Sequence, residues 1–402
     1  MVTPASYPQQ LLIKDLELSA LLEITQAINA NLPVESLYRI YHFTLLANLK
    51  IEKLVLVVKE DKWQCKVEFG NSESIKNREL NLDLNEGESE DVLLKREDLP
   101  FCEFDLVLPV KHKNHTLAYV FVDQKNDHQI IDTSFIQTIS NVILVAVENK
   151  KLARRQLEQE ALRKEMDIAR QVQSHLFPTN LPFNDSIQVQ AKYLPHQTIG
   201  GDYYDYVPLG DNKCLVCIAD VSGKGIPAAL LMSNVQASIR TMVRYTEDLK
   251  TYVLQLNQLI LEHAKGEKFV TCFIGIVDFQ NKSLQYVNCG HLPIPLKVDG
   301  KLYSMELGTT ILGMLNNLPF INVGELKLGR DNVMLLYTDG VSECNNEQGD
   351  EYGTEHIQEL VAKSETGQEN NLIQTVIDDL MRYKGPVGYN DDVTLLSIKI
   401  RL

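Results

Sequence analysis

The spacing of apolar residues changes twice along the chain and divides it into three parts. Apolar residues recur at three- and four-residue steps in 15–30 and 34–49, which predicts two amphipathic helices. Strand-like apolar runs follow at 54–58, 66–69, 104–110 and 117–122. The polar, acidic segment 71–100 has the composition of loops and turns. Residues 1–133 are therefore predicted to form a mixed domain of helices and strands.

The middle of the chain has the pattern of one long helix. No Gly or Pro interrupts the sequence between Ser134 and His175, and about 40 residues at about 1.5 Å each would span roughly 60 Å. Apolar residues follow three-, four- and seven-residue steps, at Ile139, Ile143, Ala146, Ala153, Leu157, Ala161, Ile168, Val172 and Leu176. This row predicts a coiled-coil seam in a helical linker over 134–177, through which two chains would form a parallel homodimer. The alternative is a linker helix that packs only on its own domains.

After Pro178 and Pro182 the pattern becomes that of a second α+β domain, residues 178–402. Strands are expected at 187–193, 203–208, 214–219, 269–278, 283–289, 320–328, 332–337 and 393–400. Helices are expected at 226–245, 248–264, 355–363 and 370–383. Pro227 suits the start of the first of these helices, where its missing N–H has no helical partner to lose.

Composition and charge exclude some partners. Of the 402 residues, 44% are hydrophobic and 23% are charged, which is ordinary for a globular protein long enough for two domains. The formal net charge of −15 argues against a nucleic-acid partner, which would need a basic face. No apolar run reaches the roughly 18–20 residues of a membrane span, and the N-terminus lacks a signal-peptide pattern. Neither nucleic acid nor a membrane is expected as a partner.

The seven cysteines form no disulfide framework. Cys214 and Cys217 make a C-x-x-C within a predicted strand, where residues three apart point to opposite faces. A shared metal or disulfide is therefore not expected at this pair, and both side chains are predicted to lie in the core. Free cysteines indicate a reduced, cytoplasmic protein.

Acidic residues stand where predicted strands end. In 200–225, GGDYYDYVPLGDNKCLVCIADVSGKG, Asp202 and Asp205 precede an apolar run that ends at Asp220, and glycines then allow a tight turn. A second apolar strand ends at Asp339 in VMLLYTDGVSE. The last strand is preceded by two acids in NDDVTLLSI, at 391 and 392. Oxygen donors without His or Cys at ligand spacing are typical of sites for hard divalent ions such as Mg²⁺ or Mn²⁺.

Such a cluster would suit the hydrolysis of a phosphate monoester. Two divalent ions about 3.5–4 Å apart can bridge one water, lower its pKa and shield the phosphate charge. One acid must then bridge both ions, and Asp220, at the centre of the densest motif, is the candidate. The structural alternative stays open for each acid alone, because an Asp before Gly, such as Asp339, is usually a turn residue.

Five short motifs occur in one order along the second half of the chain: Gly200-Gly201-Asp202, Asp220-Val221-Ser222-Gly223-Lys224-Gly225, Cys289-Gly290-His291, Tyr337-Thr338-Asp339-Gly340 with Glu343, and Asn390-Asp391-Asp392-Val393-Thr394. Together they resemble the bacterial SpoIIE/RsbU branch of the PPM family of metal-dependent serine/threonine protein phosphatases, over roughly 165–402. The resemblance implies an αββα sandwich, in which two antiparallel sheets pack face to face with helices outside. It also implies two Mg²⁺ or Mn²⁺ ions and a phosphorylated protein substrate, a STAS-type antagonist in bacterial partner switching.

The resemblance assigns metal binding to six positions, by side chain or, at Val221, by backbone carbonyl: Asp202, Asp220, Val221, Asp339, Asp391 and Asp392. Asp202 and Asp220 are the catalytic candidates, Asp202 as a ligand or as an acid that holds metal-bound water. Asp392 ranks below Asp391, because its position is often filled by Asn in the family. Asp205 is expected to orient water around the site.

Two departures from the better-known eukaryotic relatives leave the proton donor unassigned. Those relatives have a sequence similar to Asp-Gly-His-Gly at the second motif, where this chain has Val221 and Ser222 in place of Gly and His. Their phosphate-binding arginine has no evident counterpart before Gly200 in this chain. His291 is interpreted as a turn residue rather than an acid, and Lys224 as a solvated side chain. The donor would then be a metal-bound water or a group of the partner.

The N-terminal part resembles a GAF sensor domain in LAYVFVDQKND…FIQTISNVILVAVENKKL. The resemblance implies a sensory or regulatory role for 1–133 with an unidentified signal. A domain that serves only dimerisation or partner docking is the other interpretation.

Two other functions fit parts of the chain. Gly200-Gly201-Asp202 is similar to the GGDEF hairpin of diguanylate cyclases, but Tyr-Tyr replaces Glu-Phe, and that reading leaves Asp339 and Asp391 unexplained. A catalytically inactive scaffold, or pseudophosphatase, would bind a partner without turnover. The presence of all the expected acids argues against it.

Overall fold

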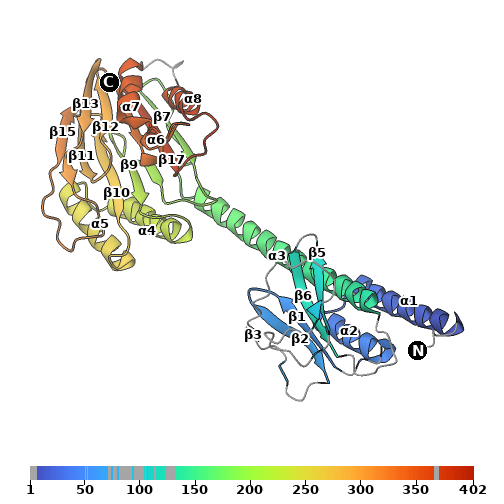
Figure 1. Ribbon diagram of the computed structural model, residues 1–402. Helices are drawn as coiled ribbons and strands as arrows, with labels where there is room; N and C mark the ends of the chain where they lie inside the picture. The colour runs from blue at the N-terminus through green and yellow to red at the C-terminus, as the bar shows by residue number, and fades with distance from the viewer. Residues whose placement is uncertain are drawn as a thin grey trace. The chain divides into compact units, whose positions relative to one another are not determined.

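The computed structural model describes residues 7–49, 51, 53–70, 74–75, 79–80, 93–94, 104, 106–112, 115–123, 132–365 and 371–402 (Figure 1). The chain divides into two compact units, Met1–Ala161 and Leu162–Leu402. None of the helices within those described ranges is both long enough and apolar enough to cross a membrane.

The N-terminal unit consists of helices packed on one face of an antiparallel sheet. Its helices are α1 (Tyr7–Asn29), α2 (Val34–Leu49) and the first part of α3 (Thr133–Ser174). Its strands are β1 (Leu54–Lys59), β2 (Trp63–Phe69), β3 (Glu79–Leu80), β4 (Leu93–Leu94), β5 (Leu106–His112) and β6 (His115–Val122). They pair in the order β3-β2-β1-β6-β5-β4. The predicted helices and strands are confirmed, and most of 71–100 lies outside the described residues.

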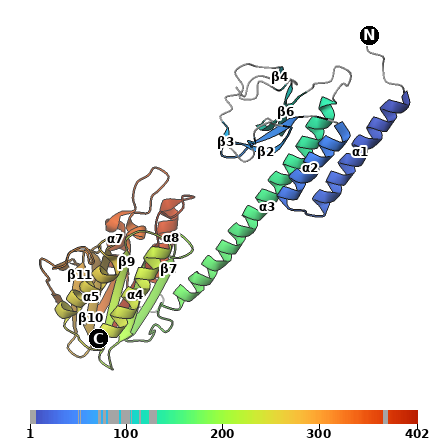
Figure 2. The ribbon, with the colours of Figure 1, turned by 90° about the horizontal axis from the view of Figure 1, so that it is seen from below.

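The helices of this unit cover one face of the sheet (Figure 2). Leu54, Leu56 and Val58 of β1 pack with Ile24 of α1 and Leu37 of α2 in one buried cluster. The alternate β1 residues pack on the other face, in a smaller cluster with Phe104 and Phe121. This two-residue alternation explains why β1 is apolar throughout.

Helix α3 is continuous over 42 residues, as its lack of Gly and Pro predicts. The apolar row along it has two different environments. Ile139, Ile143 and Ala146 are buried in the core of the N-terminal unit. Leu157 and Val172 are 67% and 61% exposed. The first part of the expected seam is therefore domain core, and only the second part is free to pair.

Within residues 162–365 and 371–402, the C-terminal unit has two sheets and five helices besides the end of α3; the strands pair antiparallel except β14, which pairs with β11 in parallel. One sheet has the order β14-β11-β10-β9-β8, with β15 also paired to β11, and the other has the order β13-β12-β16-β17-β7. The strands are β7 (Ile187–Leu194), β8 (Tyr203–Pro208), β9 (Lys213–Val221), β10 (Val270–Asp278), β11 (Ser283–Cys289), β12 (Ile294–Val298), β13 (Lys301–Met305), β14 (Gly308–Thr309), β15 (Gly324–Lys327), β16 (Asp331–Tyr337) and β17 (Val393–Arg401). The helices are α4 (Ile226–Met242), α5 (Leu249–Ala264), α6 (Asp339–Ser342), α7 (Gly353–Lys363) and α8 (Leu372–Lys384).

The two sheets share one hydrophobic core and have helices outside, so the α+β sandwich is confirmed. Helices α4 and α5 lie on one side of the sheets, and α7 and α8 lie on the other (Figure 1). Strand β9 is buried from Cys214 to Ala219, because one of its faces meets the other sheet and the opposite face meets α4. Cys214 and Cys217 are both fully buried here, as predicted.

The sequence prediction missed the hairpin formed by β12 and β13. Its turn consists of Asp299 and Gly300, both with positive φ, at 46° and 87°. This is the two-residue Asp-Gly turn typical of hairpins. The dipeptide between apolar runs was the available signal. The region expected as a strand over 320–328 is shorter, since β15 spans only Gly324–Lys327.

Candidate metal-binding and catalytic site

The predicted acids lie at neighbouring ends of strands from both sheets. Asp220 is the penultimate residue of β9, and Asp202 immediately precedes β8, its partner in the same sheet. Asp339 follows β16, and Asp391 precedes β17, which are paired in the other sheet. Because the two sheets face each other, these four ends meet at one corner of the sandwich, called the acidic corner below.

Asp202 is buried and tied to the second sheet by two threonines. It is 2% exposed. Its Oδ2 accepts hydrogen bonds from the hydroxyls of Thr338, at 2.8 Å, and of Thr394. Burial and the nearby Asp220 carboxylate raise its pKa well above the usual value, while the two hydroxyls act in the opposite direction. The bonds to Thr338 and Thr394 fix this carboxyl group across the two sheets.

Asp220 and Asp339 repel each other across the corner. Burial and then the charges of Asp339 and Asp391 raise the pKa of Asp220 to about 7. Burial and the Asp391 charge likewise raise the pKa of Asp339. These shifts show that the carboxylates are close together and partly withdrawn from water. A bound cation would relieve the repulsion between them.

Asp391 is partly exposed and has a basic neighbour. Its Oδ2 lies 2.8 Å from the Nζ of Lys224, and the side chain of Asp391 is 42% exposed. Lys224 also donates to the Asn390 carbonyl at 2.6 Å. The lysine thus links the loop after β9 to the segment before β17. The expectation that its side chain is merely solvated is therefore wrong.

Asp392 holds the loop that carries Asp202. Its two carboxylate oxygens accept from the backbone N–H groups of His196, at 2.7 Å, and Gly201, at 3.0 Å. A Cβ at Gly200 would lie 1.8 Å from Asp392 Oδ2, so the first glycine of the Gly-Gly-Asp motif permits this approach. The bonds give Asp392 a positioning role, which agrees with its lower rank among the expected ligands.

The second glycine of that motif gives access to the Val221 carbonyl. A Cβ at Gly201 would lie 2.7 Å from the Val221 carbonyl oxygen, closer than real contacts allow. Gly340 has a similar function, since a Cβ there would lie 2.0 Å from the Asp392 carbonyl. The glycines flanking the acids are therefore needed for close packing of the backbone around the corner.

The donor set of the acidic corner fits hard divalent cations. Carboxylate oxygens and one backbone carbonyl are the ligands that Mg²⁺ and Mn²⁺ prefer. Within the described ranges, no group of three or more His, Cys, Asp or Glu side chains converges closely enough to coordinate one ion. The acids are thus near enough to shift one another's pKa values but do not converge on a single point.

Asp205 does not belong to this corner, and its expected role in orienting water is wrong. The side chain is fully buried and forms a two-point ion pair with Arg240, at 2.7 and 2.9 Å. Its carboxylate also accepts from the Tyr203 hydroxyl and the Tyr206 N–H. All of these partners are protein groups, so Asp205 stabilises the packing of α4 on β8.

His291 links the two sheets beside the corner. Its Nε2 lies 3.0 Å from the Tyr337 carbonyl, which can only accept, so Nε2 carries the proton and Nδ1 accepts from the Thr271 hydroxyl at 2.9 Å. Burial lowers the pKa of His291 to about 4, so the ring is neutral near pH 7. Thr271 is paired with Asp220 in the sheet. His291 is a positioning residue here rather than an acid.

Sequence reasoning missed the two threonines that hold Asp202. Thr338 had been interpreted as a local hydrogen-bond former, whereas its hydroxyl bonds Asp202 and accepts from the Thr394 N–H at 3.1 Å. Thr394 was not singled out at all. The only sequence signal was its place two residues after Asp392 within the last motif.

Comparisons with known proteins agree with this fold. Residues 210–401 match the family model "Stage II sporulation protein E (SpoIIE)". Protein IcfG of Synechocystis is 23% identical over 69% of this chain and 46% of that protein. Phosphoserine phosphatase RsbU of Bacillus subtilis is 25% identical over 60% of this chain and 71% of that protein. The chain thus spans about half of the first relative and under three quarters of the second.

One solved structure has the same fold as the C-terminal unit. The SiaA-PP2C domain of Pseudomonas aeruginosa superposes with a TM-score of 0.53 at 19% identity, over 61% of this chain and 98% of that domain. The Gly-Gly-Asp segment also lies between strands of different sheets, β7 and β8, and is not the turn of a hairpin as in diguanylate cyclases. Residues 210–401 therefore match a SpoIIE-type domain in sequence, and the C-terminal unit that contains them has the fold of a PP2C domain.

Proposed function

We propose that this chain is a metal-dependent protein phosphatase that hydrolyses phosphoserine or phosphothreonine with two Mn²⁺ or Mg²⁺ ions. The observation that carries the proposal is the acidic corner, where Asp202, Asp220 and Asp339 meet although 137 positions separate the first from the last. The relative RsbU is a phosphoserine phosphatase, which supports the same substrate chemistry.

Each residue of the corner would have a distinct part. Asp220 would contact both ions, and Asp339 and Asp391 would complete the second ion site, with the Val221 carbonyl as a further donor. Bound there, a pair of divalent ions supplies a water of lowered pKa and shields the phosphate charge. Asp202, held by two threonine hydroxyls, would bind an ion or orient water within the site. Asp392 would keep Asp202 in place through the loop at Gly201.

The remaining parts of the proposal concern partners. The resemblance to the SpoIIE/RsbU branch favours a phosphorylated STAS-type protein as the substrate. The exposed apolar side chains of α3, among them Leu157, Ile168 and Val172, would pair two chains into a homodimer, since water contact with such a row is unfavourable. The N-terminal unit, at the other end of this helix, would then regulate the phosphatase.

A phosphopeptide assay tests the activity directly. The native chain should release phosphate from a phosphoserine peptide with Mn²⁺, and excess chelator should abolish the release. Asp339→Asn should lower turnover, because one proposed ligand loses its charge. Asp211→Asn is the matched control: Asp211 is exposed in the turn before β9 and should leave turnover unchanged.

Two results would count against the proposal. Phosphate release that is equal with Mn²⁺ and with chelator would exclude a metal-dependent mechanism. No release from phosphoserine, phosphothreonine or STAS-type phosphoprotein substrates, in a chain that binds Mn²⁺, would favour the inactive scaffold.

A further inference from the structure

The N-terminal unit contains a cavity that the phosphatase proposal does not use. It has a volume of about 1080 Å³ and lies between α2, the hairpin of β1 and β2, and the first part of α3. Small-molecule sites typically have volumes of roughly 300–1,000 Å³. The cavity is thus large enough for a small organic ligand.

The walls of this cavity are basic although the whole chain is acidic. Five basic side chains line it, against three glutamates: Arg39, Lys66, Lys150, Lys151 and Arg154. The chain as a whole has a net charge of −15. On an acidic protein, such a local excess of positive charge favours the binding of anions at this site.

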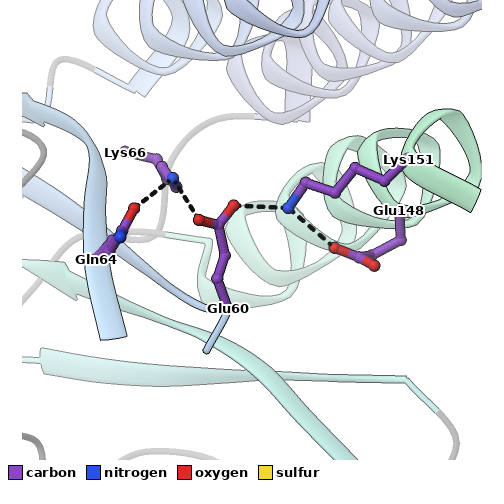
Figure 3. Close-up of polar contacts among 5 residues, drawn as sticks. All are labelled: Glu60, Gln64, Lys66, Glu148 and Lys151. Atoms are coloured by element: carbon purple, nitrogen blue, oxygen red, sulfur yellow. Dashed lines mark hydrogen bonds and ion pairs between the residues drawn. The ribbon is translucent and has the colours of Figure 1, made fainter. Parts of the chain in front are cut away.

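Two of the lysines already share one oxyanion, the carboxylate of Glu60 (Figure 3). Lys66 extends from β2 and Lys151 from α3, and they approach Glu60 from opposite sides, at 2.9 and 2.6 Å. Burial acts against the charge of Glu60, yet the hydrogen bonds from Lys151 and Lys66 hold its pKa below the usual value. The site therefore stabilises an anionic oxygen in a partly buried position.

The lysines retain donors beyond those they use within the protein. An ammonium group has three N–H donors. Lys66 uses two, on Glu60 and Gln64, and Lys151 uses two, on Glu60 and Glu148. Lys150 donates to the carbonyl and the side chain of Asn31, at 3.0 and 2.5 Å. Counting contacts with the described residues, each lysine thus keeps one donor for a ligand or for water.

Burial strengthens the electrostatic attraction between these ammonium groups and an anion. The side chains of Lys66 and Lys151 are only 17% and 30% exposed, so solvent screens their charges less than at an open surface. The Tyr38 hydroxyl, another group of the lining, is buried and has no hydrogen-bond partner in the described part of the chain. A ligand oxygen would satisfy this donor as well.

Apolar side chains complete the lining, among them Val34, Val67 and Leu157. We propose that the cavity binds a small organic anion whose phosphate or carboxylate group contacts Lys66, Lys150 and Lys151 and whose apolar part packs on these apolar side chains. Because α3 supplies part of the wall and continues into the C-terminal unit, the bound anion contacts the helix that joins the two units.

Calorimetric titration of the 402-residue chain with two probes that share an apolar ring, phenyl phosphate and benzoate, tests this inference. Prior treatment with a chelating resin removes divalent ions from the acidic corner without adding a competing polycarboxylate, and low ionic strength limits screening. At least one probe should bind, and the comparison tells whether phosphate or carboxylate is preferred. Lys150→Ala should weaken binding about ten- to hundredfold, because one charge-assisted hydrogen bond is lost. Glu60→Gln should strengthen it, because the competing carboxylate is removed.

Arg155→Ala is the matched control, since Arg155 lies on the same helix with the same charge but outside the lining. It should bind as the native chain does. Arg39→Ala, on α2, provides a second variant of the wall in case Lys150→Ala folds poorly. The inference is overturned if neither probe binds the native chain at millimolar concentration, or if Lys150→Ala, Arg39→Ala and Arg155→Ala all bind equally. Neither result bears on phosphatase activity, so the two proposals fail independently.

Discussion

Asp220 in the C-terminal unit and Glu60 in the N-terminal unit are both carboxylates partly withdrawn from water, yet their pKa values shift in opposite directions. Asp220 has other aspartates as neighbours, and its pKa rises to about 7. Glu60 lies between Lys66 and Lys151, and its pKa falls. Burial raises the pKa in both cases, so the sign is decided by the neighbouring charges. Paired charges can stabilise a fold, whereas gathered like charges destabilise it unless a cation binds.

The largest expected effect is a loss of turnover without a loss of stability when Asp220 is replaced. Asp220→Asn should lower phosphopeptide turnover on the order of a thousandfold or more, because the acid proposed to contact both ions is lost. In chelator, its unfolding free energy should equal or exceed that of the native chain, because one of several repelling charges is gone. Turnover assays and urea unfolding in EDTA measure the two effects. Near-native turnover would remove Asp220 from the proposed mechanism.

A paired buried charge should behave in the opposite way. Arg240→Ala leaves the fully buried Asp205 without its guanidinium partner. The unfolding free energy should fall by about 2–4 kcal/mol, near the lower part of the range for broken buried pairs, since Arg240 is itself 40% exposed. Urea unfolding measures the loss. The double variant Asp205→Asn with Arg240→Ala should lose less, and an equal or larger loss would contradict the ion-pair explanation.

His291 should make stability depend on pH in a defined range. Burial lowers its pKa from 6.5 to about 4, so between these values the unfolded chain binds a proton that the folded chain does not. Its contribution is complete above pH 6.5 and declines as pH falls toward 4, by up to about 3 kcal/mol. The stability difference between the native chain and His291→Gln should therefore shrink on acidification. A difference that is constant from pH 7 to pH 4 would contradict the buried neutral ring.

The hydroxyls that hold Asp202 should contribute less. Thr394→Val keeps the shape of the side chain and removes one hydrogen bond to a buried carboxyl group, which should cost about 1–2 kcal/mol in unfolding free energy. Turnover should fall as well, because Asp202 is then less firmly positioned. Thr251→Val, at the exposed start of α5, is a control that changes stability without changing turnover.

The smallest effect is expected for an exposed pair. Arg154 and Glu158 on α3 are 83% and 62% exposed and lie 2.9 Å apart. Arg154→Ala should change the unfolding free energy by no more than about 0.5 kcal/mol, because solvent screens the pair. Urea unfolding measures this change. A much larger loss would mean that an exposed ion pair stabilises this fold as much as a buried one.

Local sequence patterns predicted most elements of the fold. The run from Cys214 to Ala219 and the last strand were recognised because both of their faces are buried, which makes them continuously apolar. The β12–β13 hairpin was missed because its strands are short and partly exposed, with the turn at Asp299 and Gly300 as the main signal. The row on α3 appeared to be one seam because periodicity alone does not tell core contacts from contacts with another chain.

The candidate site was predicted less completely than the fold. Acids at strand ends were found because each stands beside an apolar run, and the structure brings Asp202, Asp220 and Asp339 together. The partner of Asp205 was not found, since Arg240 lies 35 residues away on a helix and no local pattern connects them. Thr394 was missed for a similar reason, because its hydroxyl matters only through a contact with Asp202, 192 residues earlier.

The binding of divalent ions at the acidic corner is the claim on which the proposed function depends, and calorimetric titration of the metal-free chain with Mn²⁺ tests it most directly. The account predicts binding of two ions by the native chain, weakened or lost in Asp220→Asn and Asp339→Asn and unchanged in Asp211→Asn. Absence of Mn²⁺ and Mg²⁺ binding at millimolar concentration, or binding that is the same in all four proteins, would contradict it.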